Sequence, residues 1–360
     1  MNYTRLVLSR FGGLGDMVML TPLLRGIKTL YPEVRLTVVG NPNAREIMTR
    51  CPFVDEYFTY DKSFHDTLFL IRNLWRADFV YLMDTLYRIS TVYALARIKV
   101  RVGLPHKRKK FLTHYLSVKP WMNYAFEPVV YATFLKEATG IDVMQLPDWD
   151  QFYFPEANAD EKERVQNLLK GYIQIDEGYI VCSLETGGWQ KDWLIEYWQI
   201  LFEKLKNFGK KVIVIGSAPN RFKDVNFSNN VIDLRGKTNL LETGYIIDNA
   251  DLLINCCSLP VHIANAMNTP VIGLYGSQPD YRCRPQKIYK SIYSKAPCAP
   301  CDMMFDGPGR CEHPYCMESI TPEIVMNTIK SFYAEGCPLG PKNLKLIYEE
   351  KMLHEFKRKV

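Results

Sequence analysis

A carboxylate follows a cluster of glycines near the start of the chain. Residues 11–24 read Phe-Gly-Gly-Leu-Gly-Asp-Met-Val-Met-Leu-Thr-Pro-Leu-Leu, after the apolar run Leu6–Leu8. This order predicts a strand, a glycine turn and a helix that begins at Asp16. A helix N-terminus stabilises an anion, and Gly13 and Gly15 let backbone N–H groups approach a ligand closely. The arrangement therefore indicates a role in ligand binding or catalysis rather than in core packing.

A second glycine-containing segment, residues 185–193, offers the groups that bind a diphosphate. It reads Glu-Thr-Gly-Gly-Trp-Gln-Lys-Asp-Trp and follows the predicted strand Tyr179–Ser183. A hydroxyl from Thr186, backbone donors at Gly187 and the ammonium of Lys191 suit phosphate oxygens. The alternative is a solvated turn with a surface lysine, and spacing alone does not decide between the two.

Two further loops follow predicted strands in the second half. Residues 257–262 read Cys-Ser-Leu-Pro-Val-His. Ser258 is placed to cap a helix whose N–H groups would hold an anion. His262 falls in the first turn of that helix, where a histidine is more often structural than ligand-binding. The loop Gly216–Asn220 by itself indicates only a turn.

Four of the ten cysteines gather late in the chain, namely Cys298, Cys301, Cys311 and Cys316. Their loop, 297–316, is rich in proline and glycine and is long enough to need something that holds it. Four thiolates around structural zinc or iron would do so. Reduced cysteines in a packed loop, or disulfides, are the alternatives, and His313 is a substitute ligand. A closed four-thiolate site has no open coordination position, so we expect no catalytic role for it.

Strands and helices alternate along the whole chain, which predicts an α/β fold with parallel sheets. The strands predicted in the first half are Arg5–Leu8, Arg35–Val39, Tyr57–Tyr60, Phe79–Met83 and Val100–Val102. The helices predicted there are Asp16–Leu30, Ala44–Arg50, Phe64–Trp75, Arg88–Ala96 and Phe126–Thr139. The strands predicted in the second half are Tyr179–Ser183, Lys211–Ile215, Val231–Leu234, Leu252–Asn255 and Val271–Tyr275. The helices predicted there are Trp193–Asn207, Asn239–Asn249 and Leu259–Met267.

This pattern predicts two Rossmann-like domains that face a central cleft, with ligands beyond the carboxyl ends of the strands. The expected boundaries are 1–150 for the first domain, 151–175 for a linker, 176–335 for the second domain and 336–360 for a basic C-terminal helix. A length of 360 residues is too great for one typical core.

Composition narrows the function classes. The chain is 47% apolar and 23% charged with a net charge of +6, as in ordinary globular proteins. The sequence shows no membrane-spanning run and no secretory signal, so we expect a cytoplasmic protein. A nicotinamide site is disfavoured, because Val18 replaces the third glycine of the dinucleotide motif and no carboxylate follows Val39.

Positive charge concentrates in one stretch of the first half, at Arg97, Lys99, Arg101, Lys107, Arg108, Lys109 and Lys110. Such runs usually form a solvated face, but they also suit an anionic ligand or an anionic membrane surface. The interleaved aromatic residues typical of single-strand RNA binding are not evident, which argues against nucleic acid.

The chain resembles glycosyltransferase family 9, the ADP-heptose heptosyltransferases of bacterial surface glycan assembly. The resemblance rests on Gly-Leu-Gly-Asp-Met-Val-Met-Leu-Thr-Pro-Leu-Leu-Arg at 13–25, Phe-Val-Asp-Glu at 53–56 and Lys-x-Trp at 191–193. It also rests on Gly-Lys-Thr-Asn-Leu at 236–240 and on the segment from Ser258 to Val271. It covers nearly the whole chain.

The resemblance implies a GT-B fold and an inverting transfer that needs no catalytic metal or other catalytic cofactor. The first domain would take the acceptor, a glycan or glycolipid such as lipopolysaccharide core, and the second would bind a nucleotide-diphospho-sugar such as ADP-heptose. Asp16 matches the general base. Thr186 and Lys191 match diphosphate contacts, where Lys191 would neutralise the leaving group. Ser258 and the amides after it would hold the same phosphates.

Two departures from the family pattern bear on the donor. The family usually has Asp-Ser/Thr-Gly before the proline, whereas this chain has Cys257, Ser258 and Leu259. Asn220 stands where an acidic nucleotide contact is expected. The alternatives to a heptosyltransferase acting on a glycan are therefore a catalytically weak or silent nucleotide-sugar-binding protein and a protein O-heptosyltransferase.

Overall fold

The computed structural model of the protein describes residues 3–173, 177–283, 288–302, 311, 313 and 315–336. Residues 337–360, most of the predicted C-terminal helix, lie outside the described residues, as does part of the predicted cysteine loop. The chain forms two compact units, which divide between Ala157 and Asn158. The described residues of 281–284 and 301–309 belong with the first unit, although they follow most of the second in sequence.

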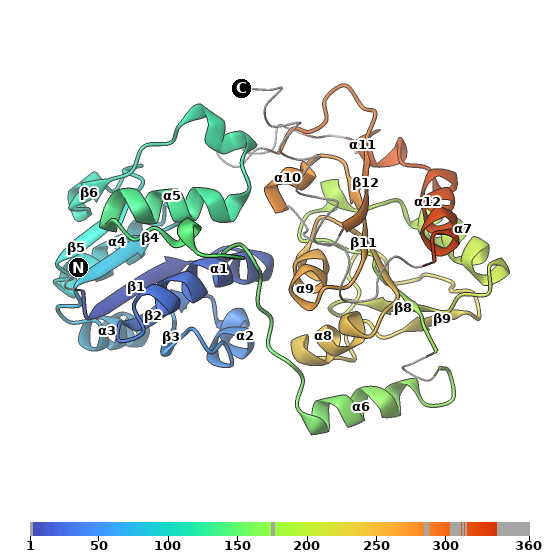
Figure 1. Ribbon diagram of the computed structural model, residues 1–360, viewed down its shortest axis with the longest axis horizontal. Coiled ribbons are helices and arrows are strands. Elements are labelled where there is room, and N and C mark those ends of the chain that lie inside the picture. The colour runs from blue at the N-terminus through green and yellow to red at the C-terminus, as the bar shows by residue number, and fades with distance from the viewer. Residues whose placement is uncertain are drawn as a thin grey trace. The chain divides into compact units, whose positions relative to one another are not determined.

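The first unit is a six-stranded parallel sheet covered by helices (Figure 1). Its strands are β1 (Arg5–Arg10), β2 (Arg35–Gly40), β3 (Glu56–Thr59), β4 (Phe79–Leu82), β5 (Val100–Gly103) and β6 (His114–Tyr115). Its helices are α1 (Leu14–Leu30), α2 (Arg45–Thr49), α3 (Phe64–Asn73), α4 (Tyr87–Leu95) and α5 (Glu127–Thr139). The strand order is β3-β2-β1-β4-β5-β6, so that β2 and β3 are added on one side of β1 and β4 to β6 on the other. The order of the strands therefore reverses between β1 and β4, although all of them are parallel.

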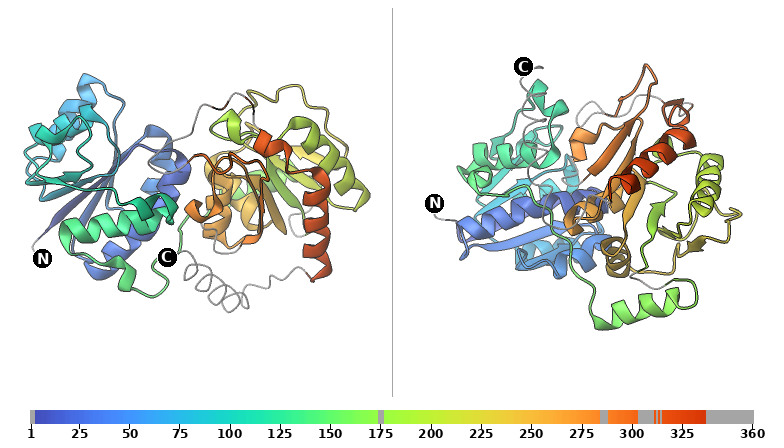
Figure 2. Two further views of the ribbon diagram at one scale, coloured as in Figure 1. Left: turned by 90° about the horizontal axis from the view of Figure 1, so that it is seen from above. Right: turned by 45° about the vertical axis from the view of Figure 1, so that its right-hand side comes forward.

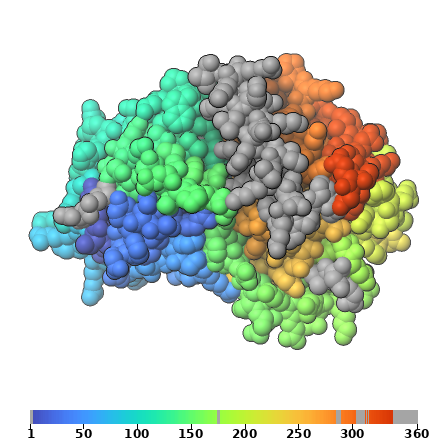
Figure 3. All heavy atoms as spheres, in the orientation of Figure 1, coloured from blue at the N-terminus to red at the C-terminus, as the bar shows by residue number. Residues whose placement is uncertain are grey.

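Helices cover both faces of this sheet because its strands are apolar on both faces. Val7 and Val80 pack with the buried residues of α3 and α4 on one face. Leu6 and Leu8 alternate with Val7 and so point to the opposite face. Helices α1 and α5 pack against each other and lie side by side in the space-filling view (Figure 3).

The second unit repeats the same topology. Its strands are β7 (Ile180–Ser183), β8 (Val212–Ile215), β9 (Val231–Asp233), β10 (Leu252–Cys256), β11 (Val271–Tyr275) and β12 (Ile288–Tyr293). Its helices are α6 (Ala159–Leu169), α7 (Ile195–Asn207), α8 (Leu240–Asp248), α9 (Leu259–Met267), α11 (Tyr315–Glu318) and α12 (Pro322–Ala334). The short α10 (Asp280–Cys283) has its first residue in this unit and its other three in the first unit. The order β12-β11-β10-β7-β8-β9 reverses between β7 and β10.

The core of the second unit explains why α7 forms where it does. Trp198, Leu201, Phe202 and Leu205 have the i, i+3, i+4, i+7 spacing of one helix face, and all four are buried. This face packs on β7, β8 and β10, and α12 packs beside α7 (Figure 2).

The predicted α/β class and two-domain fold are confirmed, and the predicted strands agree with the structure to within two residues at each end. The differences lie where periodicity is weak. Helix α6, capped by the side chain of Asn158, occupies part of the segment expected to be a linker. Strand β6 has only two residues, and β12 and α12 were not predicted. No helix in the described part of the chain is long and apolar enough to cross a bilayer.

Asp78 ties three strands of the first unit together at their amino ends. Its carboxylate accepts hydrogen bonds from the backbone N–H groups of Thr4 (2.9 Å) and Arg5 (3.0 Å), and it lies 2.6 Å from the Lys99 ammonium. Burial raises the pKa of Asp78, but the hydrogen bonds from Lys99 and Thr4 outweigh burial and lower the pKa to about 2.

We expect Asp78→Asn to lower the free energy of unfolding of the first unit by about 2 kcal/mol at neutral pH. The folded pKa lies below that of the unfolded chain, so this stabilisation is present above about pH 4 and is lost as the pH falls toward 2. Urea titrations of wild type and variant at several pH values measure the difference. A difference that stays constant from neutral pH down to acid would contradict the assignment.

Candidate active site

Asp16 lies in the first turn of α1, two residues inside the helix rather than at its first residue. Its carboxylate accepts a hydrogen bond from the backbone N–H of Gly13, the residue that precedes the helix. A Cβ atom at Gly12 would lie only 2.6 Å from Cγ of Asp16, so this position needs glycine. The loop after β1 therefore holds Asp16 in one place.

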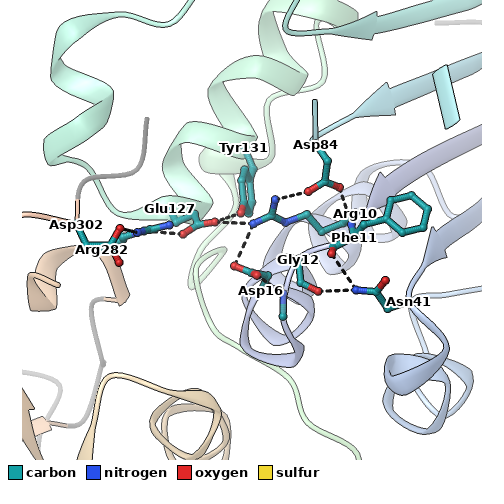
Figure 4. A network of polar contacts seen from close by, with 11 residues as sticks. Arg10, Phe11, Gly12, Asp16, Asn41, Asp84, Glu127, Tyr131, Arg282 and Asp302 are labelled. Atoms are coloured by element: carbon teal, nitrogen blue, oxygen red, sulfur yellow. Dashed lines mark hydrogen bonds and ion pairs between the residues drawn. The ribbon is translucent and has the colours of Figure 1, made fainter. Parts of the chain in front are cut away.

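Arg10, the last residue of β1, connects Asp16 to two other carboxylates (Figure 4). Its Nη2 atom lies 3.0 Å from Asp16 and 3.1 Å from Glu127, and its Nη1 atom lies 2.8 Å from Asp84. Burial lowers the pKa of Arg10, but Tyr131, Asp16, Glu127 and Asp84 together raise it well above its ordinary value. The guanidinium is thus a fixed cation among three acids.

Neighbouring elements hold this cluster in turn. Asp84 follows β4 and also accepts the backbone N–H of Phe11 at 2.5 Å. Asn41 follows β2, and its amide donates to the carbonyl oxygens of Phe11 and Gly12, both at 2.8 Å. Polar side chains at the carboxyl ends of three adjacent strands therefore fix the loop that carries Asp16.

Glu127 is the most deeply buried acid of the cluster, with 2% of its side chain exposed. It begins α5, where the helix N-terminus stabilises its negative charge. It accepts hydrogen bonds from the hydroxyl of Tyr131 and, at 3.1 Å, from Nε of Arg282. Burial lowers the pKa of Arg282, but Glu127 and Asp302 raise it above its ordinary value.

A cavity of about 350 Å³ opens within the first unit beside this cluster. Arg10, Asp84, Glu127, Tyr131 and Arg282 supply its polar wall. Its remaining wall is largely apolar, at Phe11, Leu86, Leu104, Leu116, Val130 and Phe134. A mostly apolar hollow with a few convergent polar groups is the usual form of a small-ligand site.

In the second unit, the loop after β7 is clamped by a network of charged groups. The carboxylate of Glu185 accepts the backbone N–H groups of residues 220–222 at 2.9–3.1 Å. Burial raises the pKa of Glu185, but these backbone hydrogen bonds lower it more. Asp192 accepts the backbone N–H of Thr186 at 2.7 Å and the guanidinium of Arg221 at 2.5 Å.

Lys191 ends a short 3₁₀ turn, Trp189–Lys191, in this loop. Trp193 anchors the segment, because it is fully buried and its indole N–H donates to the carbonyl oxygen of Ile320 at 2.7 Å. The ammonium of Lys191 makes no hydrogen bond or ion pair with any residue that the structure describes. A cation held on an anchored turn without a counter-charge suits an anionic ligand.

The loop after β10 carries the other candidate phosphate ligands. Asn255 is buried, accepts the N–H of Ser183 at 3.0 Å and donates to the hydroxyl of Ser258 at 2.7 Å. It thereby joins the ends of β7 and β10, the two strands at which the sheet order reverses. Open α/β sheets bind ligands in the crevice at such a point.

Several residues predicted to bind phosphate make hydrogen bonds within the protein instead. Ser258 precedes α9, but its side chain makes no capping hydrogen bond, and its oxygen accepts a hydrogen bond from Asn255 instead. The hydroxyl of Thr186 donates to the carbonyl oxygen of Gly188 at 2.7 Å and so shapes the turn. The N–H of Gly13 is taken by Asp16, whereas Gly187 is exposed.

The remaining predicted residues divide into buried and exposed ones. His262 and Cys257 are buried in and before α9, and Asn220 is exposed, with its backbone N–H on Glu185. Gly15 is the second residue of α1. Burial and exposure alone do not test whether these residues contact the donor, so those contacts stay predictions.

Three residues of the predicted basic patch bind groups of the protein itself rather than forming a solvated face. Arg108 is fully buried, donates to the carbonyl oxygen of Leu104 at 2.9 Å, and burial lowers its pKa to about 10. Lys99 pairs with Asp78, and Arg101 donates to the carbonyl oxygen of Phe111 at 2.6 Å. Exposed lysines without an ion pair to a described residue remain at positions 107, 109 and 110.

The four clustered cysteines differ in burial. Cys298 is exposed, Cys301 and Cys311 are half-buried, and Cys316 is buried. Within the described ranges, no three His, Cys, Asp or Glu side chains come together as a metal site would require. Residues 303–310, 312 and 314 of this loop lie outside those ranges, and the metal site stays a prediction.

The family model described as "Glycosyltransferase family 9 (heptosyltransferase)" matches residues 68–306, more than half of the chain. The chain belongs to glycosyltransferase family 9. It is therefore a glycosyltransferase, and its two Rossmann-like units are those of the GT-B fold. The matched range begins after Asp16, so that residue's role rests on the geometry above and on the motif at 13–25.

Individual relatives agree with this membership. The chain is 25% identical over 306 residues to the lipopolysaccharide core heptosyltransferase OpsX of Haemophilus influenzae, covering 80% of this chain and 84% of that one. Its fold is similar to that of Escherichia coli ADP-heptose lipopolysaccharide heptosyltransferase II, with a TM-score of 0.71, 20% identity and coverage of 92% and 99%. It is also similar in fold to the iron-containing dodecameric glycosyltransferase TibC of enterotoxigenic Escherichia coli, with a TM-score of 0.56, 16% identity and coverage of 92% and 77%.

Two of the motifs that carried the family resemblance hold the glycosyltransferase fold together. Asp55 lies 2.8 Å from the Lys28 ammonium and accepts the N–H of Leu36 at 2.6 Å, which fixes β2 against α1. Asn239 caps α8 by exchanging hydrogen bonds with Glu242. Gly236 needs its positive φ of 70°, and a Cβ there would lie 3.0 Å from Cα of Ala218.

Sequence reasoning missed Arg10, Asp84, Glu127 and Arg282. Arg10 and Asp84 had a usable signal, because each is a charged residue at or just after the carboxyl end of a buried strand. Glu127 and Arg282 had none, since nothing in their own neighbourhood indicates that they meet.

We expect Glu185→Gln to loosen the loop at residues 220–222, whose backbone N–H groups Glu185 holds. The amide keeps one acceptor oxygen for three backbone N–H groups, so hydrogen exchange should rise at Asn220, Arg221 and Phe222. Mass-spectrometric hydrogen exchange measures this, and the exposed Glu196→Gln is the matched control. Equal protection in both variants would show that Glu185 does not clamp the loop.

Proposed function

We propose that this glycosyltransferase moves a heptose from ADP-heptose to a hydroxyl of a bacterial surface glycan such as lipopolysaccharide core, with inversion at the anomeric carbon. Two observations carry the proposal. The first unit holds an oriented carboxylate, Asp16, whose partner Arg10 lines a cavity, and the second unit holds a cation, Lys191, that has no counter-charge among the described residues. The heptosyltransferase names of the relatives support the choice of heptose and of lipopolysaccharide.

Asp16 acts as the general base of the transfer. As the acceptor oxygen forms its bond to the anomeric carbon, its proton passes to the Asp16 carboxylate. The bond between that carbon and the diphosphate oxygen breaks, and ADP leaves from the opposite face. A single displacement of this kind inverts the anomeric configuration. The hydrogen bond from Gly13 and the ion pair with Arg10 orient the carboxylate for this step.

Lys191 stabilises the negative charge that develops on the departing diphosphate. The exposed backbone at Gly187 and the N-terminal turn of α9 supply further donors. Because the Ser258 oxygen accepts from Asn255, its own proton points elsewhere and is available to a phosphate oxygen. The Thr186 hydroxyl supports this site by shaping the turn through its hydrogen bond to the carbonyl oxygen of Gly188.

The acceptor is anionic in this proposal. The exposed lysines at 107, 109 and 110 follow β5 of the unit that holds Asp16, and they suit the phosphates or carboxylates of a glycolipid. The same charge suits a peripheral contact with the inner membrane surface.

We expect Asp16→Asn and Lys191→Ala to separate chemistry from donor binding. Asp16→Asn should keep its affinity for ADP and lose transfer by at least about 100-fold, because the amide cannot accept the proton. Lys191→Ala should weaken ADP binding by about 10- to 100-fold, because a charge-assisted contact is lost. Calorimetric titration with ADP and an assay of ADP release from ADP-heptose measure the two effects.

The same assay decides between the transferase and a silent nucleotide-sugar-binding protein, which Cys257 and Leu259 favour. ADP-heptose binding by the wild type without turnover on heptose-free lipopolysaccharide would support the silent protein. Full activity of Asp16→Asn would refute the role of Asp16 as base.

We also propose that Cys298, Cys301, Cys311 and Cys316 hold one structural zinc or iron ion. Four thiolates are the donor set that such ions prefer, and the fold neighbour TibC is described as iron-containing. Cys316 already packs against the chain, since a Cβ at Gly276 would lie 2.8 Å from its sulfur. The ion would order the loop and take no part in transfer.

Protein purified without chelators should contain about one zinc or iron per chain by elemental analysis. Cys298→Ser/Cys301→Ser should lose the metal and lower the melting temperature, and the buried Cys51→Ser serves as a control that keeps the metal. Metal-free wild type, or full occupancy in the double variant, would end this part of the proposal.

A further inference from the structure

Two acids of the Arg10 cluster share one nitrogen atom. Nη2 of Arg10 contacts Asp16 at 3.0 Å and Glu127 at 3.1 Å, while Nη1 contacts Asp84 at 2.8 Å. The guanidinium is planar and rigid, so its two nitrogens cannot adjust independently. The position of Glu127 therefore helps to set where Nη2 lies, and with it where the Asp16 carboxylate is held (Figure 4).

Glu127 is itself placed by a residue that is remote in sequence. Its second carboxylate oxygen lies 3.1 Å from Nε of Arg282, and Nη1 of Arg282 lies 3.8 Å from Asp302. Arg282 stands in α10, and Gly276–Pro279 join α10 to the end of β11 in the second unit. A chain of contacts thus runs from a segment after β11, through Glu127 and Arg10, to Asp16.

We propose that Arg10 is a positioning residue for Asp16, and that Glu127 and Arg282 act on Asp16 through it. The inference rests on the proposed function, in which Asp16 is the base. Without Arg10, the Asp16 carboxylate keeps the Gly13 hydrogen bond but loses the cation that it shares with Asp84 and Glu127. Like charges then repel, and Asp16 turns away from the acceptor hydroxyl.

The consequence is specific to the chemical step. An error of about 1 Å in the placement of a catalytic group can cost about 100-fold in rate. The donor contacts proposed above lie in the second unit, so the KM for ADP-heptose should not change. A residue that merely stabilised the first unit would instead change the melting temperature and leave kcat intact.

The kinetic test compares Arg10→Gln, Arg10→Lys and Arg282→Gln, with ADP-heptose as donor and heptose-free lipopolysaccharide as acceptor. Arg10→Gln should lower kcat by about 100-fold with the donor KM within about twofold. Arg10→Lys should lose only about 10-fold, because an ammonium keeps the charge but cannot reach three acids. Arg282→Gln, which leaves Arg10 intact, should also lose about 10-fold. Guanidinium ion in the buffer should restore part of the activity of Arg10→Ala.

Asp78→Asn is the matched control, because it breaks another carboxylate network of the same unit. It should lower stability without lowering kcat. If it lowers kcat as much as Arg10→Gln does, or if Arg10→Gln raises the donor KM and leaves kcat unchanged, Arg10 is not a positioning residue.

Crystal structures of the wild type and of Arg10→Gln test the same inference without any assay. The Asp16 carboxylate should stay beside Gly13 and Arg10 in the wild type and adopt a different rotamer in Arg10→Gln. An unmoved Asp16 in the variant would overturn the inference. Because this measurement does not need turnover, a wild type that transfers no heptose would overturn the proposed function and leave the positioning role to be decided by the structures.

Discussion

The ion pair between Arg10 and Asp16 is the interaction on which the proposed transfer depends. A helix N-terminus stabilises a carboxylate in its first turn as an anion, but it does not fix the orientation of that carboxylate. Here the orientation of Asp16 is fixed by the guanidinium of Arg10, which lies 3.0 Å away and is itself held by Asp84 and Glu127. The missing side chain at Gly12 leaves the space that Asp16 fills. The sheet order then places these groups at the reversal between β1 and β4.

The second unit has the same topology but presents a positive charge. At the reversal between β7 and β10, the carboxylates of Glu185 and Asp192 bind backbone N–H groups and hold the turn. The amide of Asn255 joins the ends of the two strands. Lys191 is left without a counter-charge among the described residues. One unit thus holds an oriented carboxylate and the other holds a cation on an anchored turn, and these are the two groups that the proposed transfer from a diphospho-sugar would use.

The sequence was sufficient for the fold class and for the two loops that matter most. Buried runs such as Val212–Ile215 and the glycine turn before Asp16 are local signals, and local signals predict local structure. The Arg10 cluster is not local: Arg10 and Asp84 are 74 residues apart, Arg10 and Glu127 are 117 apart, and Glu127 and Arg282 are 155 apart. Ser258 shows the other limit. Its position before a helix predicts a cap, but in the structure its oxygen accepts from Asn255 and caps nothing.

A crystal structure of the protein with ADP-heptose tests the central claim most directly. The account predicts the diphosphate against Lys191 and the first turn of α9, with the anomeric carbon turned toward Asp16 and room for one hydroxyl oxygen between them. A diphosphate bound away from Lys191, or a sugar that faces away from Asp16, would contradict it.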